Sequence, residues 1–481
     1  MSYYKYFLGV VWCLICYTQL EAQIKVPSIS NIIKGTGEKV VIKDIVISGN
    51  KKTQEKVVVR ELGFGIGDSL PISNIAGVLD RIKLNLLNTK LFSDVQMNIK
   101  NWEEDGLDLH VTVIEKWYIT PIPIFQLADR NLNEWWVDRN HDFKRIQYGV
   151  AVNWANFRGR NETLNISGSL GFAQMLTLDY QMPNLSRNGR FGASFNVMMM
   201  QTKRMAYDTY KDKLLFYYDD DMIKRSVDLS SRLLLHKNIY IQHYVEGKFS
   251  YRWVDDKISQ LNQDYFLNGA NQQIAVSLKY GFDIDKRTLK AYPTRGFQVE
   301  GSITNYGLGL QKQVNMTTTS LFASKFFTLD KYEKHSTGHS IKLKASYPSK
   351  QPYNIQSGLG YEQDFVRGYE LYVIDGQSYA LIKNEYRYKL GSLRLSFNKK
   401  KANKVPKQVF PIDFYLKTYL DAGYVEDKYF TEFNTLRNKW MMGTGVGLDI
   451  LVLYDRLIRM EYSINREKKH GFFIHLELPF K

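Results

Sequence analysis

The residues with the clearest chemical potential in this sequence form a run of four in its C-terminal half: Val366, Arg367, Gly368 and Tyr369. Arginine is always charged, and its planar guanidinium can donate two parallel hydrogen bonds to one carboxylate. The run lies among short segments in which apolar and polar side chains alternate. An arginine in such a setting is expected inside a closed β-barrel and away from lipid. We therefore predict that a loop carries it into the barrel lumen.

The sequence gives little support for catalysis. Its eight histidines show no HExxH or other metal-ligand spacing, and it contains no P-loop and no GxSxG motif. Gly443, Gly445 and Gly447 alternate in a strand-like segment without a following helix, so they are interpreted as barrel backbone and not as a nucleotide-binding loop. Both cysteines, Cys13 and Cys16, precede the expected mature chain. We predict a protein that is not an enzyme, with no catalytic residue, no metal site and no cofactor.

Composition and alternation favour a membrane-spanning β-barrel. Aromatic residues are 14% of the chain, yet the mean hydropathy is −0.34. After the N-terminus, no apolar run reaches the roughly 18 residues that a spanning helix needs. Beyond about residue 117, apolar and charged faces alternate to the end, as in residues 413–421 and 472–480. A soluble β-sandwich would alternate too, but repeated charged inner faces favour a closed barrel, since an open sheet edge is not tolerated in lipid.

The N-terminal part is predicted to contain a signal peptide, a leader and one small α/β domain. Residues 1–22 combine a basic start at Lys5, an apolar stretch and a cleavage site after Ala22. Residues 23–39 form the polar leader, and residues 40–116 predict a compact domain in the order β-α-α-β-β. Its expected elements are a strand at 40–48, a helix at 53–62, a second helix capped by Ser73, and strands at 95–100 and 107–115.

The net charge of +16 is large. Basic proteins often bind nucleic acid, but an exported chain seldom meets any, so nucleic acid is not an expected partner. Anionic lipid headgroups, the phosphates of lipopolysaccharide and a basic barrel lumen account for the charge instead. The densest basic run is Lys399–Lys401 with Lys404 and Lys407. It is interpreted either as a solvated turn or as a contact with headgroups.

Motifs at several separated places carry a family resemblance. They are residues 47–53, 60–62, 67–68 and 91–95 in the N-terminal domain, then Tyr292–Phe297 with Pro293, Arg295 and Gly296, Val366–Tyr369, Tyr419–Gly423, residues 443–449 with Gly445, and residues 457–462. In this order they resemble the superfamily of POTRA-plus-barrel outer-membrane proteins. That superfamily includes BamA-like and TamA-like assembly factors, the bacterial surface antigen family and two-partner secretion transporters. The resemblance covers nearly all of the mature chain, in a short form with a single POTRA domain.

The resemblance implies a mainly β fold, with a barrel of about 16 antiparallel strands over residues 117–481 behind the POTRA domain. It also implies a sixth loop, around residues 361–376, that folds back into the lumen. There Arg367 is expected to pair with Asp421, which lies on the charged face of its strand; a plain surface-loop arginine is the alternative. Other charged residues should point inward and either extend this pair or only make the lumen polar. These are Glu385, Arg387, Arg459 and Glu461.

Function is expected at the seam where the first and last strands meet. The first strand is placed near residues 117–127, and its Pro121 and Pro123 donate no hydrogen bond and should weaken pairing there. A linker between the POTRA domain and the barrel is the alternative for these prolines. The last strand brings Gly471 and Phe480 to the seam. A client strand is expected to add to this edge by β-augmentation.

The resemblance therefore implies an assembly factor that folds or inserts β-barrel clients in the bacterial outer membrane, with its POTRA domain in the periplasm. The alternatives are a polypeptide-secreting transporter of the two-partner type and a non-catalytic accessory subunit of an outer-membrane complex. Expected partners are unfolded outer-membrane proteins or secreted polypeptides, periplasmic chaperones or accessory lipoproteins, and lipid with lipopolysaccharide. Two features depart from the family: there is room for a single POTRA domain, and Lys481 follows the aromatic Phe480.

Overall fold

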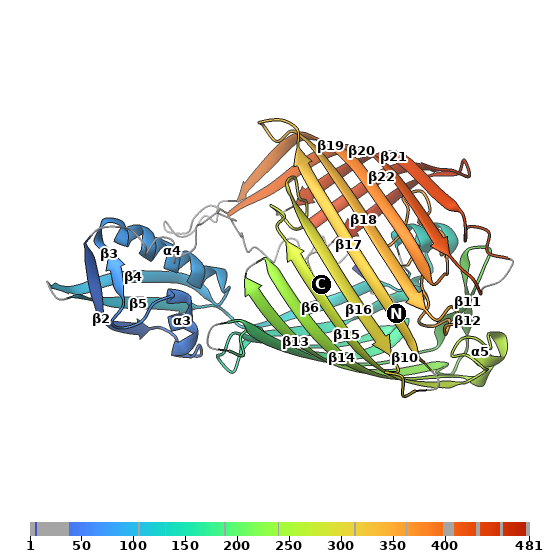
Figure 1. The fold of residues 1–481 in the computed structure, drawn as a ribbon, viewed down its shortest axis with the longest axis horizontal. Helices are drawn as coiled ribbons and strands as arrows, with labels where there is room; N and C mark the ends of the chain where they lie inside the picture. The colour runs from blue at the N-terminus through green and yellow to red at the C-terminus, as the bar shows by residue number, and fades with distance from the viewer. Residues whose placement is uncertain are drawn as a thin grey trace.

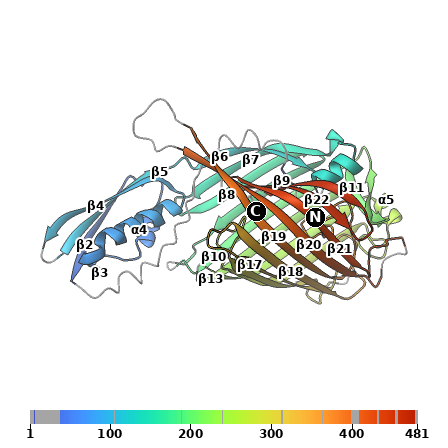
Figure 2. The same ribbon diagram turned by 90° about the horizontal axis from the view of Figure 1, so that it is seen from above.

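The computed structural model describes residues 5–6, 38–103, 106–129, 131–186, 189–238, 240–311, 314–361, 363–397, 408–429, 433–452 and 456–477. In this part of the chain a small α/β domain stands at one end of a large β-barrel (Figure 1 and Figure 2). Most of the expected signal peptide and leader, the lysine run and Phe480 lie outside the described residues. Lys5–Tyr6 form a short strand, β1, that pairs with Leu127 and Gln126. No helix among the described residues is long and apolar enough to cross a membrane.

The α/β domain has the predicted order of strands and helices, with one short strand added. Its sheet has the order β3-β2-β5-β4, in which β2 and β5 run parallel and the other pairs are antiparallel. The elements are β2 (Lys39–Ser48), α3 (Glu55–Leu62), β3 (Ser69–Pro71), α4 (Ile75–Asn88), β4 (Phe92–Glu103) and β5 (Gly106–Glu115).

The core of this domain follows from the two periodicities in its sequence. Leu107, Leu109 and Val111 alternate along β5 and are fully buried, and they pack in one cluster with Val78 and Ile82 of α4. Burial of one such side chain contributes about 1.5–3 kcal/mol relative to leaving it in water. The domain therefore has a core of its own, against which Ala155 of the barrel also packs.

The predicted starts of both helices are wrong. Thr53 lies before α3, because its backbone N–H and its hydroxyl both donate to the carboxylate of Glu115. Ser73 does not cap α4: Ile72–Asn74 form a 3-10 turn, and Asn74 precedes the helix without a side-chain cap. A contact with Glu115, distant in the sequence, thus holds Thr53 outside α3, and a 3-10 turn takes the place of the expected cap at Ser73.

The barrel contains sixteen antiparallel strands, as the resemblance implied. Each pairs with the next along the chain, except that β13 follows β10. In the order of the sheet β6 stands next to β23, but the described residues of these two strands share no register, and the edge of β6 pairs with β1 at Leu127 and Gln126. The strands are β6 (Ile119–Leu127), β7 (Ile146–Phe157), β8 (Glu162–Gly171), β9 (Ala173–Met182), β10 (Phe191–Thr202), β13 (Lys224–Asn238), β14 (Ile241–Val254), β15 (Gln272–Asp285), β16 (Gly296–Tyr306), β17 (Met316–Thr328), β18 (His335–Tyr347), β19 (Ser378–Phe397), β20 (Gln408–Glu426), β21 (Trp440–Val452), β22 (Arg456–Asn465) and β23 (His470–Glu477).

The two ends of the barrel differ. The hairpin of β11 (Arg204–Tyr210) and β12 (Lys213–Tyr218) and the short helix α5 (Asp256–Leu261) lie at the end away from the α/β domain, here called the distal end (Figure 1). The end beside the α/β domain is the proximal end. Since β6 starts at the proximal end and successive strands are antiparallel, residues 128–145 and 348–377 connect strands at the distal end, and residues 286–295 connect strands at the proximal end.

The strands present apolar side chains outward and charged side chains inward. On β20, Leu416 and Leu420 are each 49% exposed, whereas Lys417 and Asp421 are buried. This is the alternation of a sheet with lipid on one face and a polar lumen on the other. Charged side chains buried in the lumen need partners of opposite charge, and those partners define the candidate site.

Candidate functional site

The inserted loop, residues 348–377, folds back from the distal end and packs against the inner wall of the barrel. Its Leu359, Val366 and Tyr369 form one buried cluster with Leu381 of β19 and Met441 of β21. It is longer at both ends than the predicted segment at 361–376. The loop is therefore a packed part of the barrel interior.

Arg367 is the most heavily bonded residue of this loop. Its Nε and Nη2 donate to the two oxygens of Asp421 at 2.7 and 2.6 Å, and its backbone N–H donates to the same carboxylate at 3.2 Å. Nη1 donates to Glu385 at 3.0 Å, and the guanidinium lies 3.8 Å from the ring centroid of Tyr419. Arg367 is 4% exposed and Asp421 is 0% exposed. Removing either partner would leave a buried charge without its counter-ion.

A second set of ion pairs continues from Arg367 along the wall. Glu461 Oε1 of β22 lies 3.5 Å from Arg367 Nη1 and 2.7 Å from Lys417 Nζ, and Lys417 Nζ also lies 2.7 Å from Asp449 Oδ1. Arg387 Nε donates to Glu385 at 2.9 Å. Of the two interpretations of these inward charges, the structure supports a connected network.

Glycines let the loop approach the wall. A Cβ at Gly443 on β21 would overlap the carbonyl oxygen of Arg367, so only glycine fits there. Gly368 has φ +94°, a conformation that residues with a side chain rarely adopt. The predicted motif glycines Gly423 and Gly445 also lie on the inner wall, beneath Val366 and Tyr419 respectively.

The proximal turn, residues 286–295, enters the barrel from the other end. Tyr292 is buried, donates from its hydroxyl to Asp449 at 2.9 Å, and packs on Tyr415. The carbonyl of Pro293 accepts a hydrogen bond from Arg387 at 2.8 Å. Arg295 is half-exposed and pairs with Glu333, so it does not join the network. Gly296 starts β16 with φ +98°.

The edge of β6 that faces the seam has fewer hydrogen-bond donors than an ordinary strand. Tyr118 accepts from Ala155 and Ala128 donates to Arg145, so the even-numbered residues of this segment turn their backbone groups toward β7. Backbone groups alternate sides along a strand. Pro121 and Pro123 therefore face the seam, and proline has no N–H to offer there. Both lie within β6, which excludes the linker interpretation.

On the other side of the seam, a side chain pairs with the backbone of β23. The N–H of Ile474 donates to Asn133 Oδ1 at 3.0 Å, and Asn133 Nδ2 donates to the carbonyl of Ile474 at 3.4 Å. Asn133 belongs to the first distal loop, residues 128–145, whose Asn131 also donates to the carbonyl of Glu370. A side-chain amide offers the same donor and acceptor as a peptide group. At this point of the edge, the amide of Asn133 thus takes the place of a peptide group from a neighbouring strand.

The α/β domain is fastened to the barrel close to the seam. The hydroxyl of Thr53 donates to Glu115 at 2.6 Å, lies 3.0 Å from the hydroxyl of Tyr118, and accepts from Asn156 at 2.8 Å. Burial raises the pKa of the Tyr118 phenol above its ordinary value. This joint holds the domain beside the turn between β7 and β8.

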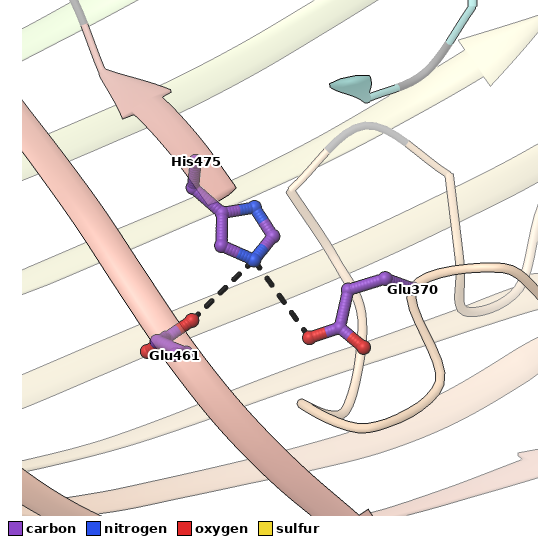
Figure 3. Close-up of side chains that lie close together, drawn as sticks. All are labelled: Glu370, Glu461 and His475. Atoms are coloured by element: carbon purple, nitrogen blue, oxygen red, sulfur yellow. Dashed lines mark ion pairs between the residues drawn. The ribbon is translucent and has the colours of Figure 1, made fainter. Parts of the chain in front are cut away.

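Within the described residues, one group of side chains could hold a metal ion. Glu370 of the inserted loop, Glu461 of β22 and His475 of β23 direct their polar atoms toward one another (Figure 3). All three are buried. The predicted seam residue Gly471 lies on the same strand as His475, near the distal end of β23.

Two family models match this chain. The Omp85 superfamily domain matches residues 156–453, more than half of the sequence. The chain belongs to the Omp85 superfamily. The surface antigen variable number repeat matches residues 40–116, which makes the N-terminal α/β domain a POTRA domain. The resemblance found in the sequence is confirmed.

Solved structures share the fold at low sequence identity. BamA from Haemophilus ducreyi, in a form lacking POTRA domains 1–3, gives a TM-score of 0.64 at 13% identity, over 92% of this chain and 84% of that chain. CdiB from Acinetobacter baumannii gives 0.50 at 14% identity, over 91% and 74%. A comparison with curated proteins found no match. Omp85 members are non-enzymatic assembly or transport proteins, and family and fold together imply an outer-membrane barrel with a periplasmic POTRA domain.

Several residues of the site were missed by sequence reasoning. Glu370 directly follows the arginine motif, so its position beside that motif was the available signal. Asp449 lies on the inward face of β21, where the alternation could have found it. Asn133 lies in a loop, 341 positions before its partner Ile474. No local pattern indicates that contact.

Proposed function

We propose that this Omp85 protein folds or inserts β-barrel clients into the outer membrane through the seam between β6 and β23. The observation that carries the proposal is the pairing of Ile474 with the side chain of Asn133. A client strand in extended conformation offers the same donor and acceptor as that amide, repeated along its length. It can therefore replace Asn133 and extend the sheet from β23 by β-augmentation.

The free energies of the hydrogen bonds favour replacement of Asn133 by a client strand. One intramolecular hydrogen bond contributes about 0.5–1.5 kcal/mol net, so the two bonds of Asn133 are worth about 1–3 kcal/mol. The seam-facing backbone groups of β23 are those of residues in step with Ile474, such as Phe472 and Leu476. A strand that pairs with all of them makes several such bonds. Pro121 and Pro123 make β6 a poor competitor for the same edge.

The filled lumen argues against secretion through the barrel. The inserted loop is held by the buried pair of Arg367 and Asp421, and the proximal turn adds Tyr292 to the same network. Breaking a buried ion pair by displacing one partner costs about 3–5 kcal/mol. A translocating chain would meet this cost, whereas a client at the seam leaves the network intact.

The POTRA domain supports delivery of the client. Its strand β4 lies at the edge of the sheet, and an edge strand can pair with an extended chain. The joint at Thr53 holds the domain beside the β7–β8 turn, near the seam. Unfolded outer-membrane proteins, brought by periplasmic chaperones or accessory lipoproteins, are the partners this arrangement suits.

Depletion of the protein, followed by quantitative proteomics of the outer membrane, tests the proposal. We expect broad loss of β-barrel proteins. Loss of one exported polypeptide with normal barrels would indicate secretion instead, and an unchanged proteome would point to an accessory subunit. Either of these results would overturn the proposal.

Photocrosslinking tests the site itself. Phe472 on β23 is 58% exposed, and Leu416 on β20 is the matched outward-facing control. A photoreactive amino acid at Phe472 should capture a nascent barrel client, and the same group at Leu416 should not. Equal capture at both positions would contradict insertion at the seam.

A further inference from the structure

Three side chains from three parts of the barrel bring ligand atoms together. His475 Nε2 lies 3.4 Å from Glu461 Oε2 and 3.7 Å from Glu370 Oε1, and these atoms all lie within 4.8 Å of one another (Figure 3). The set contains one imidazole nitrogen and two carboxylate oxygens. Zinc sites commonly use such a mixture of ligands.

Other contacts orient these side chains. Glu370 Oε2 accepts from the backbone N–H of Gly368 at 2.8 Å, and Glu461 Oε1 lies 2.7 Å from Lys417 Nζ. The ring of His475 stacks on Phe365 with its centroid 5.3 Å away. Each carboxylate thus uses one oxygen in the surrounding structure and directs the other toward the imidazole, as outer contacts do in metal sites.

Glu370 joins the ion-pair network through His475. Ion pairs connect four cationic side chains, Arg367, Arg387, Lys417 and Arg459, with four carboxylates, Asp421, Glu385, Asp449 and Glu461, and His475 lies against both Glu461 and Glu370. Within the described residues, Glu370 Oε1 is buried without a hydrogen-bond partner, and the residue is 2% exposed. A buried carboxylate of this kind is costly unless a cation compensates it.

We propose that Glu370, Glu461 and His475 bind a divalent transition-metal ion, with zinc as the best fit. Ligand atoms placed tetrahedrally about 2.0–2.2 Å from zinc lie about 3.3–3.6 Å apart, close to the 3.4 and 3.7 Å that separate His475 Nε2 from the two carboxylate oxygens. Three protein ligands leave the fourth position for water. The bound ion would join the inserted loop, β22 and the seam strand β23, and so hold the seam strand against the loop. This site is independent of the proposed insertion activity.

The test uses the full chain, purified in detergent with a histidine-free tag and stripped with a chelator. Titration with Zn²⁺ alone, with bound metal counted after gel filtration, should give one ion per chain and a rise in Tm of several degrees. Glu370→Gln, which keeps the size of the side chain, and His475→Ala should each weaken binding at least tenfold. His243→Ala is the matched control, because His243 lies on β14 beside Tyr280, away from the cluster; it should bind as the unchanged protein does.

Spectroscopy supplies a second readout. Co²⁺ in the same protein should give the intense visible absorption of a four-coordinate site, and Glu370→Gln should lose it. The absence of saturable Zn²⁺ binding would overturn the proposal. Binding that persists in Glu370→Gln, with its barrel shown to be folded by heat-modifiable mobility, would equally overturn it, since the ion would then lie elsewhere.

Discussion

The wall formed by β19–β22 and the seam between β23 and β6 are opposite in construction. On the wall, Arg367 makes two short bonds to Asp421, and the loop that carries it lies against Gly443 without space for a side chain. At the seam, Pro121 and Pro123 remove donors from one edge, and the side chain of Asn133 pairs with the other. A closed sheet in lipid can open safely only where few bonds are lost. Under the proposed function, the wall keeps its shape while the sheet opens at the seam.

Arg367→Ala should lower the stability of the barrel more than any other substitution discussed below. It leaves Asp421 buried without its counter-ion, so the free energy of unfolding should fall by about 3–5 kcal/mol. Urea unfolding in lipid vesicles, followed by heat-modifiable mobility, measures it. Arg295→Ala is the control, because its pair with Glu333 is half-exposed and is worth about 0–1 kcal/mol. Similar losses in both variants would contradict a special role for the wall.

Gly443→Ala should cause the second-largest loss of stability. The added methyl group meets the carbonyl oxygen of Arg367, so the loop must shift away from β21. Overpacking of this kind costs about 1–3 kcal/mol, and limited proteolysis should cut the inserted loop sooner. Gly168→Ala on β8 is the matched control, because no atom lies within 4 Å of the added methyl group. Equal stability and equal proteolysis of the loop in the two variants would show that the close approach of the loop to β21 does not affect stability.

Replacing both Pro121 and Pro123 with Val tests the seam from the side of β6. Two N–H donors are restored to the edge, each worth about 0.5–1.5 kcal/mol if it finds an acceptor. The barrel should become slightly more stable, and client insertion in vesicles should slow several-fold. Thr120→Val is the control, because the backbone of Thr120 faces β7. Unchanged insertion by the double variant would argue that β6 takes no part in opening.

Asn133→Ala should have the smallest effect on stability. It removes two hydrogen bonds at Ile474, one of them 3.4 Å long, so the loss should lie near the lower end of the range given above, about 1 kcal/mol. Client insertion should become faster because the edge of β23 is no longer covered. Asn165→Ala, which removes the amide contact with Asn153 between β7 and β8, is the control. Slower insertion by Asn133→Ala would mean that Asn133 helps insertion and does not compete with the client.

The fold and the ion pair on the wall could be predicted from the sequence. Strict alternation on β20 placed Lys417 and Asp421 on the inner face, because side-chain direction in a strand depends only on parity. At the seam, Pro121 and Pro123 could be predicted as well, but other contacts join segments that are far apart in the sequence. Asn133 meets Ile474, and Glu370 meets His475, only after the barrel has closed and both loops have folded inward. The contact of Tyr292 in the proximal turn with Asp449 also joins segments that are far apart in the sequence.

Backbone hydrogen exchange of the folded protein in lipid tests the contrast most directly. We expect the amides of β20 and β21 to stay protected, while the seam-facing amides of β23, Ile474 first among them, exchange at least tenfold faster. In Asn133→Ala, exchange at Ile474 should become faster and exchange in β20 should not change. Equal protection of β20, β21 and β23 would contradict the claim that the barrel opens at this seam.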